Sequence, residues 1–175
     1  MATAVEAPER LFGKAIKRRE DPRLITGAGS FLDDVRLPGM THAALVRSPY
    51  AHAKIKRIDT SAAARMPGVL GVFTGQDFLD LNPLPAAWQA ARVKNNAVTP
   101  RVLAVNAVHQ VGDPVAVVVA EDRYLAEDAA GAVVVEYEPL PVVVDAKEAV
   151  QPGAPQLHEE APNNIVLEWT CGKDE

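Results

Sequence analysis

The side chains most able to do chemistry in this sequence are four histidines that lie far apart along the chain. They are His42, His52, His109 and His158. Metal sites that can be recognised in a sequence bring histidines or cysteines together within a few positions, such as four residues apart on one helix face. No such spacing occurs here. The histidines are therefore predicted to be structural or exposed, not metal ligands.

We predict that three of the adjacent acidic pairs in the sequence are solvated or helix-capping groups. The pairs are Asp33/Asp34, Glu127/Asp128 and Glu159/Glu160. General acid–base catalysis needs carboxylates that converge and have different pKa values, whereas neighbouring side chains in a chain diverge.

Glycine and cysteine complete no motif either. The segment Gly27-Ala28-Gly29 lacks the Gly-x-Gly-x-x-Gly spacing, and no helix obviously follows it, so we interpret it as a turn. Cys171 stands alone, has no neighbouring base, and is interpreted as a small buried hydrophobe. A single cysteine excludes an intrachain disulfide and suits a reducing compartment. The sequence thus predicts no catalytic, no cofactor-binding and no metal-ligating residue.

Composition excludes several classes of protein. The net charge of −5 and the aromatic content of 5% argue against nucleic-acid binding, which needs a basic face and stacking platforms. Residues 1–8 contain no apolar run of a secretory signal, and Glu20-Asp21-Pro22 follow Arg18-Arg19 where a twin-arginine signal would continue with an apolar segment. No run approaches the roughly 18 apolar residues of a membrane span. We expect a cytoplasmic protein that binds neither nucleic acid nor membrane.

The elements expected to position these side chains begin after an extended arm. Residues 1–38 are punctuated by glycine and proline, show no lasting periodicity, and carry an excess of basic residues. Residues 39–160 have the pattern of one compact α/β domain, and residues 161–175 begin a linker or strand. Strands are expected at 41–47, 54–59 and 69–73, with a turn at Pro49 and a short helix at 60–66 capped by Asp59 or Thr60. Thr74 and Asp77 should start another helix, with Phe73 and Phe78 touching as a hydrophobic staple.

The second half of the chain predicts a strand, a helix and a strand in succession. Residues 115–120 are almost continuously apolar, which indicates a strand buried on both faces. Asp122 should cap a helix over 123–130, and 133–137 should return as a strand. This spacing predicts a βαβ unit with parallel strands and a right-handed crossover. Gly131 is either the helix C-cap, which we favour, or an interior glycine.

Three further segments are less regular. Residues 81–100 are expected to form a long loop with one helical turn near Trp88, and Asp145 should cap a turn through Val150. Residues 165–170 alternate like a strand with no following element to cover it. Such an apolar edge invites pairing with another chain.

Several segments, taken together and in order, resemble one known family. They are residues 47–53 (Arg-Ser-Pro-Tyr-Ala-His-Ala), 110–116 (Gln-Val-Gly-Asp-Pro-Val-Ala) and 136–141 (Glu-Tyr-Glu-Pro-Leu-Pro), preceded by 19–27 and 31–34. They resemble the N-terminal a/b hammerhead region of the molybdopterin-binding large subunit of the xanthine dehydrogenase, aldehyde oxidase and carbon monoxide dehydrogenase family, the molybdenum hydroxylases. Within the 47–53 motif, His52 is expected to fix the turn by hydrogen bonding through one ring nitrogen.

The resemblance implies an α/β (α+β) fold, a hammerhead-type mixed sheet with a βαβ unit. It also implies an oxidoreductase that takes oxygen from water. Molybdopterin cytosine dinucleotide with molybdenum would be bound by later domains of the complete subunit, which also hold the catalytic glutamate. The 2Fe-2S clusters and FAD would belong to partner iron–sulfur and flavin subunits. On this hypothesis the present segment binds no cofactor, is inactive alone, and packs against the remainder of the large subunit.

The sequence leaves a second function open, a free-standing hammerhead module that acts as a scaffold or small-molecule binder without redox activity. We favour the enzyme segment, because the resemblance extends to the arm and the turns, which a lone binder has little reason to keep.

Overall fold

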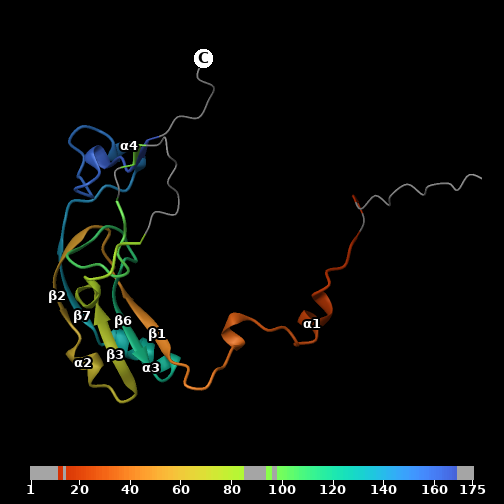
Figure 1. Ribbon diagram of the computed structural model, residues 1–175. Coiled ribbons are helices and arrows are strands. Elements are labelled where there is room, and N and C mark those ends of the chain that lie inside the picture. The colour runs from red at the N-terminus through yellow and green to blue at the C-terminus, as the bar shows by residue number, and fades with distance from the viewer. Residues whose placement is uncertain (1–11, 14, 85–93, 96–97, 169–175) are drawn as a thin grey trace, which may run out of the picture. The chain divides into compact units, whose positions relative to one another are not determined.

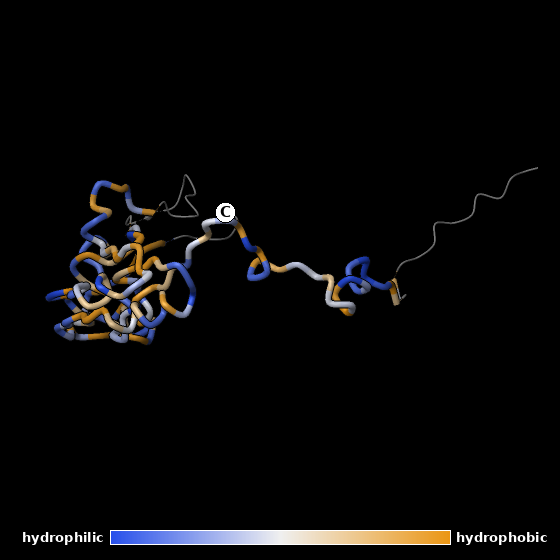
Figure 2. Tube along the Cα trace, turned by 90° about the horizontal axis from the view of Figure 1, so that it is seen from below, coloured by the Kyte–Doolittle hydropathy of each residue, from blue (hydrophilic) through white to orange (hydrophobic). Residues whose placement is uncertain are grey.

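The computed structural model describes residues 12–13, 15–84, 94–95 and 98–168, and the chain divides into two units between Gly39 and Met40. The first unit contains helix α1 (Asp21–Ile25) and the 3-10 turn η1 (Leu32–Asp34). None of its described residues is buried. Figure 2 shows apolar and hydrophilic positions interspersed along this unit. The described residues of this unit form no core.

The Gly27 segment ends α1, as the predicted turn requires. Gly27 has φ +73°, the left-handed conformation that glycine adopts without a steric cost. Its amide donates to Leu24 O at 3.3 Å, and the Ala28 amide donates to Arg23 O at 2.8 Å. This pair of bonds is a Schellman motif, which satisfies the last carbonyls of a helix.

The second unit is built on two three-stranded sheets (Figure 1). In the first, β6 (Pro114–Ala120) lies between β1 (His42–Arg47) and β3 (Val69–Thr74). In the second, β2 (Ala53–Asp59) lies between β5 (Ala107–Val108) and β7 (Val134–Pro139). All these pairs are antiparallel. The five longer strands confirm the expected strands to within two residues at each end.

The core lies against one face of the first sheet. Ala116, Val118 and Ala120 of β6 are fully buried, and the helices α2 (Ser61–Ala64) and α3 (Arg123–Gly131) supply Ala63, Ala126 and Ala129 to the same clusters. A register shift beside Val46 brings Val115 into a neighbouring cluster with Ala53 and Val108 of the second sheet. Val117 and Val119 are only half-buried. The prediction that β6 is buried on both faces is therefore wrong along part of the strand.

The predicted parallel βαβ unit is also wrong, although its strand, helix and strand are present in that order. β6 and β7 belong to different sheets, and every pairing between the described strands is antiparallel. Helix α3 packs on β1 and β6. The chain then passes to the edge of the second sheet, where β7 pairs with β2. Strand patterns in the sequence do not specify the partner strand.

The ends of α3 confirm one prediction and correct another. Asp122 accepts a hydrogen bond from the Leu125 amide at 2.9 Å, as an N-cap should. Gly131 is the last helical residue, and Ala132 is the C-cap in a right-handed conformation. Gly131 is thus not the left-handed cap that we favoured.

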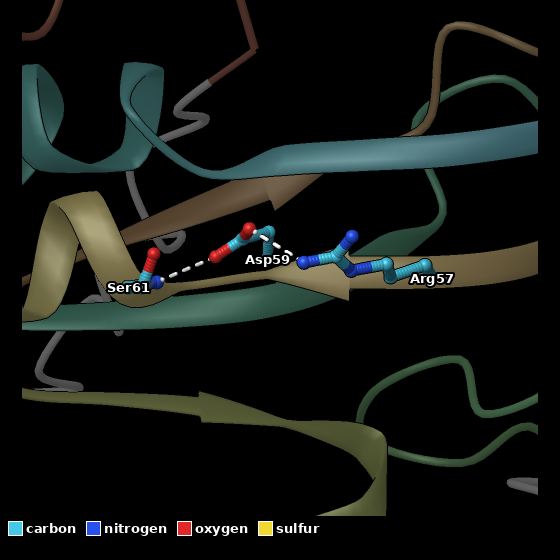
Figure 3. Close-up of polar contacts among 3 residues, drawn as sticks. All are labelled: Arg57, Asp59 and Ser61. Carbon is cyan, nitrogen blue, oxygen red and sulfur yellow. Dashed lines mark hydrogen bonds and ion pairs between the residues drawn. The ribbon is translucent and has the colours of Figure 1, made fainter.

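Asp59 organises the end of β2 (Figure 3). Its carboxylate accepts from the Ser61 amide at 3.0 Å and pairs with Arg57 at 2.9 Å. Hydrogen bonds from Ser61, and the charges of Arg57 and Arg65, lower the pKa of Asp59. Of the two predicted caps, Asp59 holds the start of α2, because the Thr60 side chain makes no capping bond.

An aspartate also holds the start of the 3-10 turn η2 (Gly75–Phe78). The Thr74 amide donates to Asp77 Oδ2 at 2.7 Å, and hydrogen bonds from Thr74 lower the pKa of Asp77. The rings of Phe73 and Phe78 lie 6.1 Å apart, which confirms the predicted staple contact.

The remaining elements are short. They are α4 (Ala146–Ala149), capped by Asp145 as expected, η3 (Pro162–Asn164), and a two-stranded ladder of β4 (Lys94–Asn95) with β8 (Leu167–Glu168). The strand expected over 165–170 is therefore confined, where described, to two residues, and it is paired where an uncovered edge was expected. Trp88 and the helical turn expected near it lie outside the described residues. None of the described helices has the length and apolar character that crossing a membrane requires.

Candidate functional site

Two of the motif-bearing segments meet at the end of β1. The Ser48 amide donates to Asp113 O at 2.9 Å, and the Gly112 amide donates back to Ser48 O at 2.8 Å. Arg47 Nη1 adds a third bond, to Gly112 O at 2.8 Å. Gly112 has φ +91°, which explains why this tight turn carries glycine. The 47–53 and 110–116 segments therefore form one hydrogen-bonded unit.

His52 joins the third segment to this unit. Its Nδ1 lies 2.8 Å from Pro141 O, and the Leu140 amide donates to His52 O at 3.0 Å. A carbonyl can only accept, so Nδ1 carries the proton. The expectation that His52 fixes its turn through one ring nitrogen is confirmed, and the turn is held against residues 140–141.

Inside the 47–53 turn the polar groups are satisfied locally. Ser48 is 2% exposed, and its hydroxyl accepts from the Tyr50 amide and bonds Tyr50 O, each at 3.0 Å. The Tyr50 ring lies 5.1 Å from that of Tyr137 on β7. Burial raises the pKa of Tyr137, against the opposing effect of the neighbouring Ser48 hydroxyl. The arrangement rigidifies the turn.

Three of the four histidines, which look scattered in the sequence, stack on one another. The ring of His109 lies 4.2 Å from that of His158 and 5.5 Å from that of His52. Asp113 Oδ2 accepts from the His109 amide at 2.7 Å, which places the middle ring. Burial, followed by the neighbouring His158 and His52, lowers the pKa of His109, against an opposing effect of Asp113. His42 lies apart on β1.

The three stacked histidines have no arrangement of metal ligands within the described part of the chain. Among the residues that the structure describes, no group of three histidine, cysteine, aspartate or glutamate side chains could hold a metal ion. His109 Nδ1 is buried without a partner, and a neutral ring tolerates this far better than a charged one. The stack instead ties residues 157–158 to the motif turns.

The other candidate residues do not come together. Asp34 Oδ2 accepts from the Phe31 amide at 2.9 Å as a local cap, and Glu127, Asp128, Glu159 and Glu160 are exposed. Cys171 lies outside the described residues. Local spacing in the sequence could not predict that the motif turns meet or that the histidines stack. The stacked residues are roughly fifty positions apart in sequence, and short-range patterns do not report contacts between distant segments.

This fold and these turns define a known class of protein. Residues 26–141 match the family model for the aldehyde oxidase and xanthine dehydrogenase a/b hammerhead domain, and the chain belongs to this family. The expected mixed α/β class is confirmed with it.

The relatives are large subunits and large chains. The carbon monoxide dehydrogenase large chain of Hydrogenophaga pseudoflava is 46% identical over 81% of this chain and 17% of its own length. The nicotine 6-hydroxylase large subunit of Paenarthrobacter nicotinovorans is 44% identical over 90% of this chain and 19% of its own.

Solved structures agree. A crystal structure of Cu,Mo-CO dehydrogenase matches with a TM-score of 0.72 and 46% identity, covering 85% of this chain and 18% of that one. Quinoline 2-oxidoreductase from Pseudomonas putida 86 matches with a TM-score of 0.72 and 39% identity, covering 84% and 18%. The present chain thus spans about a fifth of the length of these relatives.

Proposed function

We propose that this chain is the N-terminal segment of the large subunit of a cytoplasmic molybdenum hydroxylase, in which it has a structural and subunit-packing role. The observation that carries the proposal is the 46% identity to a carbon monoxide dehydrogenase large chain over most of this chain but only 17% of that one. The complete enzyme would oxidise its substrate with oxygen from water and pass electrons to iron–sulfur clusters and a flavin.

The proposal assigns three parts to the chain. Residues 1–38 are an arm for contacts with other parts of the enzyme, residues 39–160 are the hammerhead domain, and residues 161–175 lead toward the molybdopterin-binding domains. The structural division after Gly39 lies one residue from the first of these boundaries.

The motif turns among the described residues do not fit the pyrophosphate of a molybdopterin dinucleotide. A pyrophosphate needs free backbone amides at a glycine-rich turn or helix N-terminus. Here the amides of Gly27 and Gly112 are bonded to Leu24 O and Ser48 O. The polar groups of the motif turns form hydrogen bonds with one another. This supports a segment that binds no cofactor and leaves molybdopterin cytosine dinucleotide to the rest of the subunit, with the 2Fe-2S and FAD groups in partner subunits.

A free-standing scaffold module is the second candidate. It is disfavoured because a small-molecule binder needs a pocket, and the pocket lined by Gly75, Phe78 and Leu103 has room for only about one water molecule.

The test is to express the chain alone and together with the reading frame that follows its gene. The isolated chain should contain no stoichiometric molybdenum and should oxidise neither carbon monoxide, aldehydes nor N-heterocycles. Co-expression should yield a molybdenum-containing assembly that oxidises one of these classes. Stoichiometric molybdenum on the isolated chain, or no family domains encoded downstream or nearby, would refute the proposal.

A further inference from the structure

The outer face of the first sheet is apolar across all three strands. Register places Leu45 of β1 and Phe73 of β3 on either side of Val117 of β6. The next row on the same face is Ala43, Val119 and Gly71. Leu45 is 42% exposed and Phe73 is 40% exposed. We call these six residues the outer apolar face.

This face is turned away from the core. Its alternating neighbours Ala44, Val72 and Val118 belong to, or pack on, the clusters that α2 and α3 cover (Figure 1). Neither Leu45 nor Phe73 belongs to any cluster formed by the described residues. One face of the sheet is therefore covered and the other is open in the described part of the chain.

The second sheet, in contrast, carries charged side chains where its strands are exposed to water. Its strands carry exposed Lys54, Lys56 and Arg57 on β2 and Glu136 on β7, and Lys56 forms an ion pair with Glu138. The strands of the first sheet carry a single charged side chain, Arg47, at the end of β1. An antiparallel sheet with one solvated face normally alternates apolar and polar residues. The first sheet lacks that alternation, which indicates a face that is covered in use.

Phe73 is held in place before any partner arrives. A Cβ atom at Gly71 would meet the Phe73 ring at 2.8 Å, so the ring lies directly over the glycine. The Phe78 ring also packs against it, with 6.1 Å between the ring centres. An aromatic side chain that is both exposed and fixed loses little conformational entropy on binding, which is typical of an interface anchor.

We propose that the outer apolar face is the surface on which the remainder of the large subunit packs. This inference rests on the proposed function. The occupant follows from size: the relatives continue for several times the length of this chain, and an uncharged face suits permanent burial within one subunit better than a transient contact. The arm is a poorer occupant, because its exposed Ile16, Leu24 and Ile25 are interspersed with exposed charges such as Arg18, Arg19 and Arg23.

The experiment measures assembly of the tagged chain with the polypeptide encoded downstream of it. Leu45→Glu and Phe73→Glu each place a carboxylate on the face, and Tyr124→Glu is the matched control on α3, where the side chain is 82% exposed. We expect each face variant to weaken assembly at least about tenfold, because a carboxylate buried without a partner is costly, and the control to assemble like the wild type. The melting temperature of isolated Leu45→Glu and Tyr124→Glu should stay within about 3 °C of the wild type, whereas Phe73→Glu also loses its contact with Phe78 and should melt somewhat lower.

Each other outcome overturns the inference in a recognisable way. If the wild type assembles and the face variants assemble equally well, the surface is wrong and the proposed function stands. If Leu45→Glu melts much lower in isolation, residues of this chain already cover the face; repeating the measurement without residues 1–39 then tells whether the arm does so. If the wild type itself does not assemble, the proposed function fails together with the inference.

Discussion

His109 is the residue whose ionisation should be visible in the stability of the protein. Its folded-state pKa lies below the ordinary 6.5, because burial and the imidazoles of His158 and His52 disfavour the charged ring. The unfolded chain therefore binds a proton more readily than the folded one below that pH. The stabilising contribution is complete above pH 6.5 and is lost as the pH falls toward the folded-state pKa.

We expect the free energy of unfolding to fall between about pH 8 and pH 5.5, and the fall to be smaller in His109→Gln. Urea denaturation at the two pH values measures it. His42→Gln, a change on β1 outside the stack, should keep the wild-type fall. The carboxylates with lowered pKa values, Asp59, Asp77 and Glu138, act only at lower pH, since their ordinary values are 3.8 to 4.5. An identical fall in His109→Gln would show that the stack is not responsible.

At the scale of elements, β6 is where stability should depend most on which face a residue occupies. Val118 is fully buried against Ala63 and Ala129, whereas Val117 is half-buried on the outer apolar face. Val118→Asp should cost several kcal/mol, enough to unfold a domain whose total stability is about 5–15 kcal/mol, and Val117→Asp should cost clearly less. Thermal or urea unfolding of the two variants measures the difference. Equal losses would mean that the outer face is covered within this chain.

The same strand illustrates what local patterns reveal about the fold. Its run of β-branched apolar residues predicts a strand at 115–120, and Asp122 and Asp145 predict the caps that the structure confirms. Thr74 and Asp77 likewise predict the start of a helix, which the structure has as the 3-10 turn η2. These features depend on neighbours in sequence. The partner of each strand does not, because antiparallel and parallel pairing present the same alternation along one strand. The parallel βαβ unit was wrong for that reason, and the two-residue strands β4 and β5 are too short for any periodicity.

In the candidate site, too, local features could be predicted from the sequence, whereas long-range contacts could not. The turns at Pro49 and Gly112 follow from residue chemistry, and the role of His52 was expected within its motif. The stack of His52, His109 and His158 and the bonds from Ser48 to Asp113 and Gly112 depend on how two sheets bring distant loops together. Similarity to a family located the segments that matter, but only the structure relates them to one another.

At the scale of the whole molecule, the division after Gly39 makes the arm separable. None of the described residues before it is buried, and α1 contributes nothing to a core. Stability in the second unit comes from clusters formed by the two sheets and by α2 and α3. Burial of apolar surface is the main favourable term in folding, so a segment without it adds little.

Deleting residues 1–39 should therefore change the melting temperature of the isolated chain by no more than about 3 °C. In the full-length chain, trypsin should cut first at the exposed basic residues Arg18, Arg19, Arg23 and Arg36, and leave a fragment that begins close to Met40. Assembly with the downstream polypeptide should slow these cuts, because an arm that does not stabilise its own domain has most to gain from contacts with another part of the enzyme. A large drop in melting temperature on deletion would show that the arm packs on the hammerhead domain itself. Cleavage that is equally fast with and without the downstream polypeptide would remove the arm from the proposed contacts.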